Sequence, residues 1–327
     1  MTDQISGVNG QEFISIVVPC YNEEDVIGDF YNRVSVVVEK IEIQTEFIFI
    51  NDGSRDRTLA ILEALQQNDQ RIGIIDFSRN FGKEIAMTAG IDYAAGDAVI
   101  IIDADLQDPP ELIPELLSYW KKGNDVVYAK RSHREGESFL KKFTSKAFYQ
   151  IMGKISNISL PEDTGDYRLL SRRAVDALKA LRERERFMKG LFSWIGFSQK
   201  EVLFDRAPRF AGKTKWNYSK LWKFAIDGIT SFSAVPLKIA TYLGLGVASF
   251  SFIFGMWVIV KTLIWGDPVA GYPSLMTVIL FLGGVQLLFT GIIGEYLSRM
   301  YSETKRRPLY ILKQYKPSSL YYKEREL

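Results

Sequence analysis

Short apolar runs alternate with segments of helical periodicity along the first 130 residues of the chain. Each run is four to six residues long and stops at proline or polar residues, which is typical of a buried strand followed by a turn. Between the runs, apolar residues recur at the spacing expected of helices that pack on a sheet. Strands that alternate with helices predict an α/β fold with a doubly wound, mostly parallel sheet. The predicted strands cover residues 13–18, 47–50, 72–77, 98–102 and 125–129.

Polar side chains collect just after the carboxyl ends of these predicted strands. Open α/β sheets bind their ligands at this edge. A crevice so rich in acids suits a sugar or a metal-bridged diphosphate, although turns are polar in every protein. The residues concerned are Tyr21, Glu23, Asp52, Asn80, Asp103, Asp105 and Arg131.

The fourth apolar run leads into the densest group of candidate ligands. It is followed by Asp103, Asp105 and Gln107, each separated by one residue. If the strand continued through them, its pleat would place two carboxylates and one amide oxygen on the same side. Mg2+ and Mn2+ prefer such oxygen ligands, so these three residues predict a divalent-metal site. The residues that follow, Asp108 to Glu111, resemble a capping box, and an acidic turn that only caps a helix is the alternative interpretation.

The last third of the chain predicts membrane spans. Residues 239–260 and 273–294 are two uncharged segments of 22 residues each. As helices they would be about 33 Å long, enough to cross a hydrocarbon core of about 30 Å. Residues 299–327 contain eight Lys or Arg residues and three Glu residues. The positive-inside tendency therefore places this tail and the α/β domain on the cytoplasmic side of the inner or plasma membrane.

Two further segments suit a membrane surface. Residues 138–155 predict a basic amphipathic helix, which fits a membrane surface and a core-packed helix equally well. The basic loop with Arg209 and Lys215 leads to Trp216 and Trp222. Its cations suit a phosphate, and its tryptophans suit the headgroup level of a bilayer.

Composition and charge exclude several classes of protein. The formal net charge of +2 gives no support for a nucleic-acid partner. The single cysteine, Cys20, excludes an intramolecular disulfide, and the single histidine, His133, disfavours a histidine-based zinc site. Neither a Walker A motif nor a Gly-x-Gly-x-x-Gly after the first strand is found, so ATPase and dinucleotide-binding classes lose their main support. The first 12 residues lack the apolar core of a secretory signal.

Four motifs occur in order along the chain: Val17 to Glu24, Asn51 to Ser54, Asp103 to Pro110, and Gly165 to Leu169. Together with the two apolar segments, they resemble glycosyltransferase family 2 over residues 13–300. The chain is similar to the branch of dolichyl-phosphate mannose synthases and bacterial polyprenyl-phosphate glycosyltransferases, and above all to GtrB-type polyisoprenyl-phosphate glucosyltransferases. The Gln-x-x-Arg-Trp motif of processive polysaccharide synthases is missing, which favours a single transfer over polymerisation.

The resemblance implies a GT-A fold, a nucleotide-diphosphate sugar as donor and a divalent cation, Mg2+ or Mn2+. It also implies a role for particular residues, which are carried over by motif. These are Asp166 and Asp105 for catalysis, Pro19, Tyr21, Glu23, Asp52 and Asp103 for the nucleotide sugar, Asp103, Asp105 and Gln107 for the metal, and Arg131, Arg209 and Lys215 for phosphate and acceptor.

The implied organisation has five parts. They are a disordered N-terminus (1–12), a cytoplasmic GT-A catalytic domain (13–215), an interfacial segment (216–237), two transmembrane helices within 238–298 and a basic cytoplasmic tail (299–327).

The predicted reaction is inverting, metal-dependent transfer of one hexose to polyprenyl phosphate, such as undecaprenyl phosphate, at the cytoplasmic membrane face. Glucose from UDP-glucose is the expected donor sugar, and the product would serve glycosylation of the cell envelope. GDP-mannose and a UDP-aminoarabinose derivative stay open as donors, and so does assembly into a homo-oligomer. A membrane nucleotidyltransferase would instead release pyrophosphate, whereas a non-enzymatic membrane scaffold would leave Asp103 and Asp105 without a role.

Overall fold

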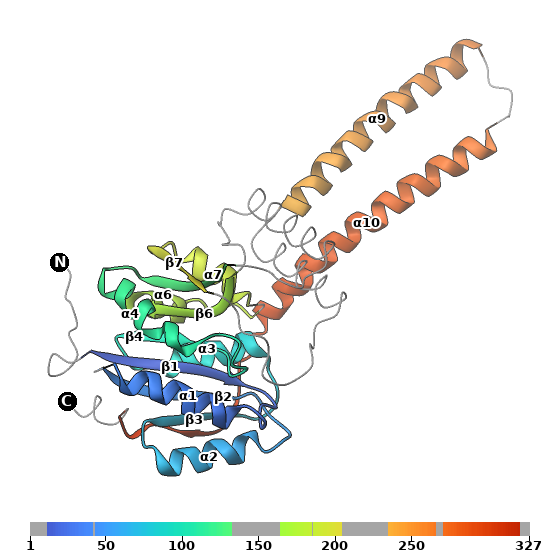
Figure 1. The fold of residues 1–327 in the computed structure, drawn as a ribbon. Helices are drawn as coiled ribbons and strands as arrows, with labels where there is room; N and C mark the ends of the chain where they lie inside the picture. Colours follow the sequence, from blue (N-terminus) through green and yellow to red (C-terminus); the bar gives the residue numbers. More distant parts are fainter. Residues whose placement is uncertain are drawn as a thin grey trace.

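The computed structural model describes residues 12–41, 43–132, 164–184, 186–204, 235–265 and 271–320. Several expectations lie outside these ranges and stay predictions. They concern the disordered N-terminus, the amphipathic helix at 138–155, the phosphate ligands Arg209 and Lys215, and most of the interfacial segment 216–237. Figure 1 shows an α/β domain from which two long helices project.

One mixed sheet lies at the centre of the α/β domain (Figure 1). Its described strands are β1 (Phe13–Cys20), β2 (Gln44–Asn51), β3 (Ile72–Phe77), β4 (Ala98–Ile101), β5 (Val126–Arg131), β6 (Thr164–Ser171), β7 (Gln199–Phe204) and β8 (Leu312–Lys316). They are ordered β7-β5-β6-β4-β1-β2-β3-β8. The central strands β4, β1, β2 and β3 are parallel, whereas β6 and β8 run antiparallel to their neighbours.

Helices cover both faces of this sheet. The described helices of the domain are α1 (Ile27–Glu39), α2 (Thr58–Asn68), α3 (Lys83–Tyr93), the short 3-10 helix η1 (Pro110–Leu112), α4 (Ile113–Lys121), α6 (Arg172–Ala180) and α7 (Met188–Trp194). In β1, Ile14 and Ile16 belong to the core beneath α1, α2 and α4, whereas Val17 belongs to the core beneath α3, α6 and α7. Successive strand residues point to opposite faces, so one apolar strand contributes to both layers.

The predicted α/β fold is confirmed, and each of the five predicted strands is present within three residues of its expected ends. The sequence pattern does not predict β6, β7 or β8. The segment that contains Asp166 is part of β6. Part of the expected C-terminal tail also belongs to the sheet, because β8 pairs with β3 at its edge.

The two projecting helices are α9 (Val235–Trp265) and α10 (Tyr272–Thr304). They lie side by side in Figure 1 and extend away from the sheet. Their windows Leu237–Trp257 and Phe281–Thr304 are long and apolar enough to cross a membrane, and neither window is buried against the rest of the protein. Both predicted spans fall within these helices.

The chain returns from α10 to the sheet through a short, well-anchored connection. Arg306 adopts a left-handed conformation, with φ at +47°, two residues after the helix ends. Tyr310 then stacks on Phe77 with 5.2 Å between ring centroids, and its hydroxyl donates to Asp92 Oδ2 at 2.8 Å. The helical pair is therefore an insertion between β7 and β8, two strands of one sheet.

Candidate active site

The strand order reverses at β1, because β2 and β3 lie on one side of it and β4 lies on the other. The loops that follow β1 and β4 diverge at such a point, and open α/β sheets bind ligands in the resulting crevice. Tyr21 follows β1 and Asp103 follows β4. The structure thus places both predicted motifs at the same edge of the sheet.

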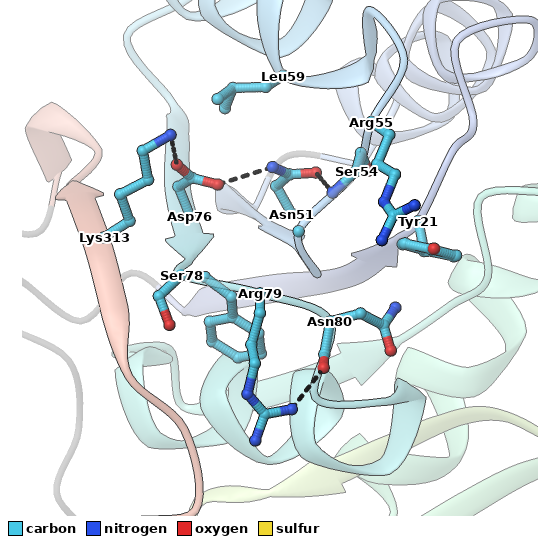
Figure 2. Close-up of a pocket in the computed structure, with 12 residues that line it drawn as sticks. Tyr21, Asn51, Ser54, Arg55, Leu59, Asp76, Ser78, Arg79, Asn80 and Lys313 are labelled. Carbon is cyan, nitrogen blue, oxygen red and sulfur yellow. Dashed lines mark hydrogen bonds and ion pairs between the residues drawn. The ribbon is translucent and has the colours of Figure 1, made fainter.

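A hollow of about 300 Å3 opens beyond the carboxyl ends of β1, β2 and β3, and we call it the strand-end hollow. Figure 2 shows Asn51 donating through Nδ2 to Asp76 Oδ1, at 2.7 Å, in its interior. Lys313 Nζ, from β8, lies 3.8 Å from Asp76 Oδ2. Tyr21 and Arg79 also line this hollow. An aromatic ring among hydrogen-bond donors and acceptors can bind a polar ligand with a planar part.

Gly53 and Asp52 shape the strand-end hollow. Gly53 has φ at +64°, and a Cβ atom there would lie 2.5 Å from the carbonyl carbon of Arg79, so only glycine fits without strain. Asp52 is buried, and its oxygens accept from the backbone N–H groups of Phe81 at 2.6 Å and Gly82 at 3.0 Å. Burial raises the pKa of Asp52, whereas these two hydrogen bonds lower it by a smaller amount. Its carboxylate therefore holds the neighbouring loop and does not line the hollow.

The predicted residues Asp103 and Asp166 meet at a single ammonium group. In the antiparallel pairing of β4 with β6, Ile101 lies opposite Arg168. Continuing that register by two residues places Asp103 opposite Asp166. Lys83 Nζ, from the first turn of α3, lies 2.7 Å from Asp103 Oδ2 and 2.5 Å from Asp166 Oδ2.

The surroundings of Asp166 favour its charged form. Burial alone would raise the pKa of Asp166, but the ammonium groups of Lys83 and Lys189 lower it well below its usual range. Burial, and then the charge of Asp166, raise the pKa of the nearby Glu84 to about 7. Asp166 Oδ1 is buried and has no hydrogen-bond partner among the described residues. An anionic oxygen with unused acceptor capacity can receive a ligand hydroxyl or face a developing positive charge.

Asp105 and Gln107 lie in a strained turn, not in a strand. Because β4 ends at Ile101, the expectation that a strand pleat aligns residues 103, 105 and 107 is wrong. Leu106 has φ at +57°, an unusual conformation for a residue with a branched side chain. Asp105 Oδ1 accepts from the Gln107 N–H at 3.1 Å. The turn, held by this hydrogen bond, sets the relative directions of the two side chains.

The expected capping box is also wrong. Helix η1 begins at Pro110, and no side chain caps it. Glu111 instead forms a two-pronged ion pair with Arg33 of α1, with both N–O distances at 2.8 Å. The turn is fixed from the other side by Tyr167 of β6, whose hydroxyl donates to the Pro109 carbonyl at 3.2 Å.

The donor chemistry around Asp103 and Asp105 suits a divalent cation, because carboxylate and amide oxygens are the ligands of Mg2+ and Mn2+. Within the described ranges, however, no three His, Cys, Asp or Glu side chains are grouped so that they could hold a metal ion. Lys83 already supplies one positive charge to Asp103. A divalent ion would therefore need ligand atoms from its substrate in addition to those of the chain.

Three further predicted residues, Pro19, Glu23 and Arg131, lie outside the strand-end hollow. Pro19 lies in β1 beside Ile50, and the Glu23 N–H donates to Thr58 Oγ1 at 2.9 Å. Arg131 ends β5, and its Nε is buried with no hydrogen-bond partner in the part of the chain that the structure describes.

Sequence reasoning missed several residues of the site. Lys83 and Glu84 begin α3. The sequence could have indicated them, because residues 78–83 follow a predicted strand as the other candidate site residues do. Arg168 lies within the fourth motif but was given no role, and Lys189 belongs to α7, where no spacing along the sequence relates it to Asp166. Arg168 Nη2 donates to the Gly165 carbonyl at 2.9 Å, and its guanidinium lies 3.8 Å from the ring centroid of Phe192.

Comparison with known proteins gives matches over nearly the whole chain. The profile described as Glycosyl transferase family 2 matches residues 15–179, and the GtrB C-terminal hairpin matches residues 235–300. A bactoprenol glucosyl transferase of Shigella phage SfV is 51% identical over 300 residues, which are 92% of this chain and 98% of that protein. An uncharacterized glycosyltransferase of Synechocystis is 55% identical over 299 residues, 91% of this chain and 94% of that protein.

One solved structure is similar to part of this chain. The crystal structure of glucosyl-3-phosphoglycerate synthase from Mycobacterium tuberculosis, in complex with Mn2+, UDP and phosphoglyceric acid, is 18% identical with a TM-score of 0.46. The match covers 67% of this chain and 76% of that chain.

The hairpin match coincides with α9 and α10, so the protein is membrane-associated. The family match covers most of β1, the strands from β2 to β6 and most of α6, a stretch that includes Asp103 and Asp166. The chain belongs to glycosyltransferase family 2, as an enzyme with a GT-A domain and a GtrB-type C-terminal hairpin.

Proposed function

We propose that the protein transfers one glucosyl residue from UDP-glucose to the phosphate of a polyprenol at the cytoplasmic membrane face. The observation that carries this proposal is the anionic Asp166, held beside Asp103 by Lys83 at the ligand-binding edge of the sheet. Relatives described as bactoprenol glucosyl transferases match over both the catalytic domain and the hairpin, which supports a glucosyl donor and a polyprenyl acceptor.

The strand-end hollow is the proposed site of the nucleotide. Tyr21, predicted to bind it, lines the hollow together with Asn51 and Asp76. Asp52 supports the adjoining loop, and Pro19 and Glu23 belong to β1 and the turn after it. A nucleotide there would direct its diphosphate toward the loops that carry Asp103 and Asp105.

Asp105, with Asp103 and Gln107, is the proposed ligand set for Mg2+ or Mn2+, completed by the diphosphate. When bound, such an ion stabilises the negative charge of the leaving group by several kcal/mol. Lys83 remains the chain's own cation at Asp103.

The proposed transfer is one direct displacement. A phosphate oxygen of the acceptor forms a bond to the anomeric carbon, the bond from that carbon to the diphosphate breaks, and the configuration inverts. The second ionisation of a phosphate monoester lies near pH ~6, so the acceptor is already largely anionic at neutrality and needs little help from a base. Asp166 then orients the sugar and stabilises its developing positive charge.

The acceptor phosphate would be met by cations near the membrane. Arg131 ends β5 and keeps a buried Nε whose hydrogen is not donated to any described residue. Arg209 and Lys215 lie outside the described residues, and their role as acceptor ligands stays a prediction.

A transfer assay tests the proposal. Purified full-length protein, polyprenyl phosphate and Mg2+ or Mn2+ are incubated with radiolabelled UDP-glucose, GDP-mannose or a UDP-aminoarabinose derivative, and the label in the organic phase is counted. We expect label from UDP-glucose, release of UDP, a β-linked product and loss of transfer in EDTA. Label from another donor alone would refute glucose as the transferred sugar. Full activity in EDTA would refute the requirement for a metal ion, and release of pyrophosphate would indicate a nucleotidyltransferase.

A further inference from the structure

A second hollow, of about 280 Å3, lies where the end of α10 meets the loop after β3. We call it the basic hollow. Phe81 and Ile85, which flank the first turn of α3, form an apolar part of its lining. Its charged lining residues are Arg79, Arg184, Lys305 and Arg307. They come from segments far apart in the sequence, so the hollow exists only in the folded chain.

The charge of this hollow is strongly one-sided, because its lining contains four cations and no carboxylate. Two of the cations are held by neutral partners. Arg79 donates to the Asn80 carbonyl at 2.9 Å and lies 3.9 Å from the ring centroid of Phe81. Lys305 lies 4.0 Å from the ring centroid of Tyr301. These contacts fix the positions of the cations without neutralising them.

Arg184 is held mainly by backbone oxygens. Its guanidinium donates to the carbonyls of Glu303, at 2.7 Å, and of Arg307. The Glu303 carboxylate lies 3.8 Å from Nη1, so it offsets part of this charge. Arg184 Nε is buried and has no hydrogen-bond partner among the described residues. The hollow therefore keeps an excess of positive charge and at least one unused buried donor.

The position of the basic hollow relates it to a membrane. Ser302 and Lys305 line it from the last turn of α10 and the residue after it, and the apolar window of that helix extends to Thr304. A helix that leaves a bilayer does so at the level of the phosphate groups of the lipids. Basic pockets beside membrane helices bind anionic lipid headgroups through the same chemistry.

We propose that the basic hollow binds the phosphate group of a membrane lipid. This site is separate from the transfer site at Asp166, although Arg79 lines both the basic hollow and the strand-end hollow. The lipid phosphate belongs either to bulk anionic phospholipid or to polyprenyl phosphate that is bound there before it enters the transfer site. A phosphate held there would dock the domain against the bilayer.

Lipid binding to full-length protein in neutral phosphatidylcholine nanodiscs tests this site. Phosphatidylglycerol, polyprenyl phosphate and free inorganic phosphate are titrated separately, and the apparent Kd is measured for the wild type and for Lys305→Gln and Arg307→Gln. Arg306→Gln is the matched control, since Arg306 has the same charge between these two residues but does not line the hollow. Thermal unfolding of each variant shows whether it is folded.

We expect each hollow variant to weaken lipid binding about fivefold, because it removes one contact to the bound phosphate, and the control to change it less than twofold. Tighter binding of polyprenyl phosphate than of phosphatidylglycerol would identify the acceptor as occupant, and equal binding would identify bulk lipid. An equal loss in Arg306→Gln, or inorganic phosphate binding as tightly as lipid, would overturn the proposal. Binding needs no sugar donor, so a failed transfer assay leaves this test unaffected.

Discussion

Asp103 follows β4 and Asp166 lies in β6, two strands that run in opposite directions, and the ammonium of Lys83 lies between the two carboxylates. Lys83 is 20 residues from Asp103 and 83 residues from Asp166 in sequence. The motifs identified both acids, but only the antiparallel register of β6 reveals that they face each other. Two carboxylates this close repel each other, and the charge of Lys83 lowers the pKa of both. Burial and the charge of Asp166 nevertheless raise the pKa of Asp103 above its usual value, so Asp166 is the more strongly anionic of the two.

Replacing Asp166 by Asn tests its positioning role. Asn preserves the size of the side chain but removes the negative charge that faces the sugar. We expect kcat to fall about 10²-fold while the KM values for donor and acceptor stay nearly constant. The rate is measured between pH 6 and pH 9. Recovery toward the wild-type rate at high pH would instead indicate a lost general base, and Asp176→Asn on the exposed side of α6 is the control.

Glu84 predicts a pH dependence of stability. Its pKa is raised to about 7 in the folded protein, so the folded state binds a proton that the unfolded state releases near pH ~4.5. The stabilisation from this proton is complete below pH ~4.5 and is lost as the pH rises through about 7. Glu84→Gln can keep an acceptor for the Met188 N–H, which lies 2.8 Å from Glu84 Oε2.

We therefore expect the Tm of the wild type to fall by a few degrees relative to Glu84→Gln between pH 5 and pH 8. Thermal unfolding of both proteins across this range measures the difference. Parallel Tm curves for the two proteins would show that Glu84 does not titrate there.

Gly53 gives a test of the strand-end hollow. An alanine at this position combines a left-handed φ with a Cβ 2.5 Å from the Arg79 backbone, so the backbone segments that contain Gly53 and Arg79 must move apart. We expect Gly53→Ala to cost about 1–3 kcal/mol of unfolding free energy and to raise the donor KM. Gly28→Ala, in α1 with no atom within 4 Å of the added Cβ, should be neutral or slightly stabilising. Equal effects of both changes would contradict this explanation.

At the scale of elements, strands with buried faces were predictable and polar edge strands were not. β1 to β4 are apolar on both faces because helices cover them, which makes a continuous run in the sequence. β7 is exposed at most of its positions, and β8 reads Leu-Lys-Gln-Tyr-Lys, so neither resembles such a run. β6 opens with Thr-Gly-Asp, which is typical of a turn. Its strand conformation is set by pairing on both sides, with β4 and β5.

Strand β8 should contribute to stability although it follows the membrane helices. It covers the edge of β3, and Lys316 Nζ lies 2.7 Å from Glu63 Oε1 of α2. Just beyond it, Ser318 donates through its hydroxyl to the buried Glu46 at 3.1 Å. At about 1 kcal/mol for each net hydrogen bond, the segment should supply at least about 3 kcal/mol.

We expect a chain that ends after residue 308 to unfold about 10 °C lower than the full chain, and to aggregate more readily through the open edge of β3. A chain that ends after residue 320 is the control, because it keeps β8 and Ser318. Thermal unfolding and size-exclusion chromatography in detergent measure both effects. An unchanged Tm in the shorter chain would show that β8 adds nothing to the domain.

At the scale of the whole molecule, the hairpin sets the position of the catalytic domain. The proposed orientation places the domain in the cytoplasm and the connection between α9 and α10 on the other side of the membrane. Gly271→Cys at that connection and Gln314→Cys in β8 should therefore differ in cells treated with a membrane-impermeant maleimide. We expect the first to react in intact cells and the second only after permeabilisation. The native Cys20 is 1% exposed and gives little background in the wild type, and the reverse pattern would contradict the orientation.

The helices α9 and α10 lie between β7 and β8 in the sequence. Completion of the sheet therefore depends on whether the chain crosses the membrane an even or an odd number of times before β8. β3 is synthesised long before the hairpin, and in the proposed orientation its partner β8 follows two crossings of the bilayer. Two crossings return β8 to the compartment of β3. A single crossing would leave β8 in the opposite compartment, and the edge of β3 would stay unpaired. A finished sheet is therefore compatible with two crossings or with none, and it excludes a chain in which only one of the two helices has crossed.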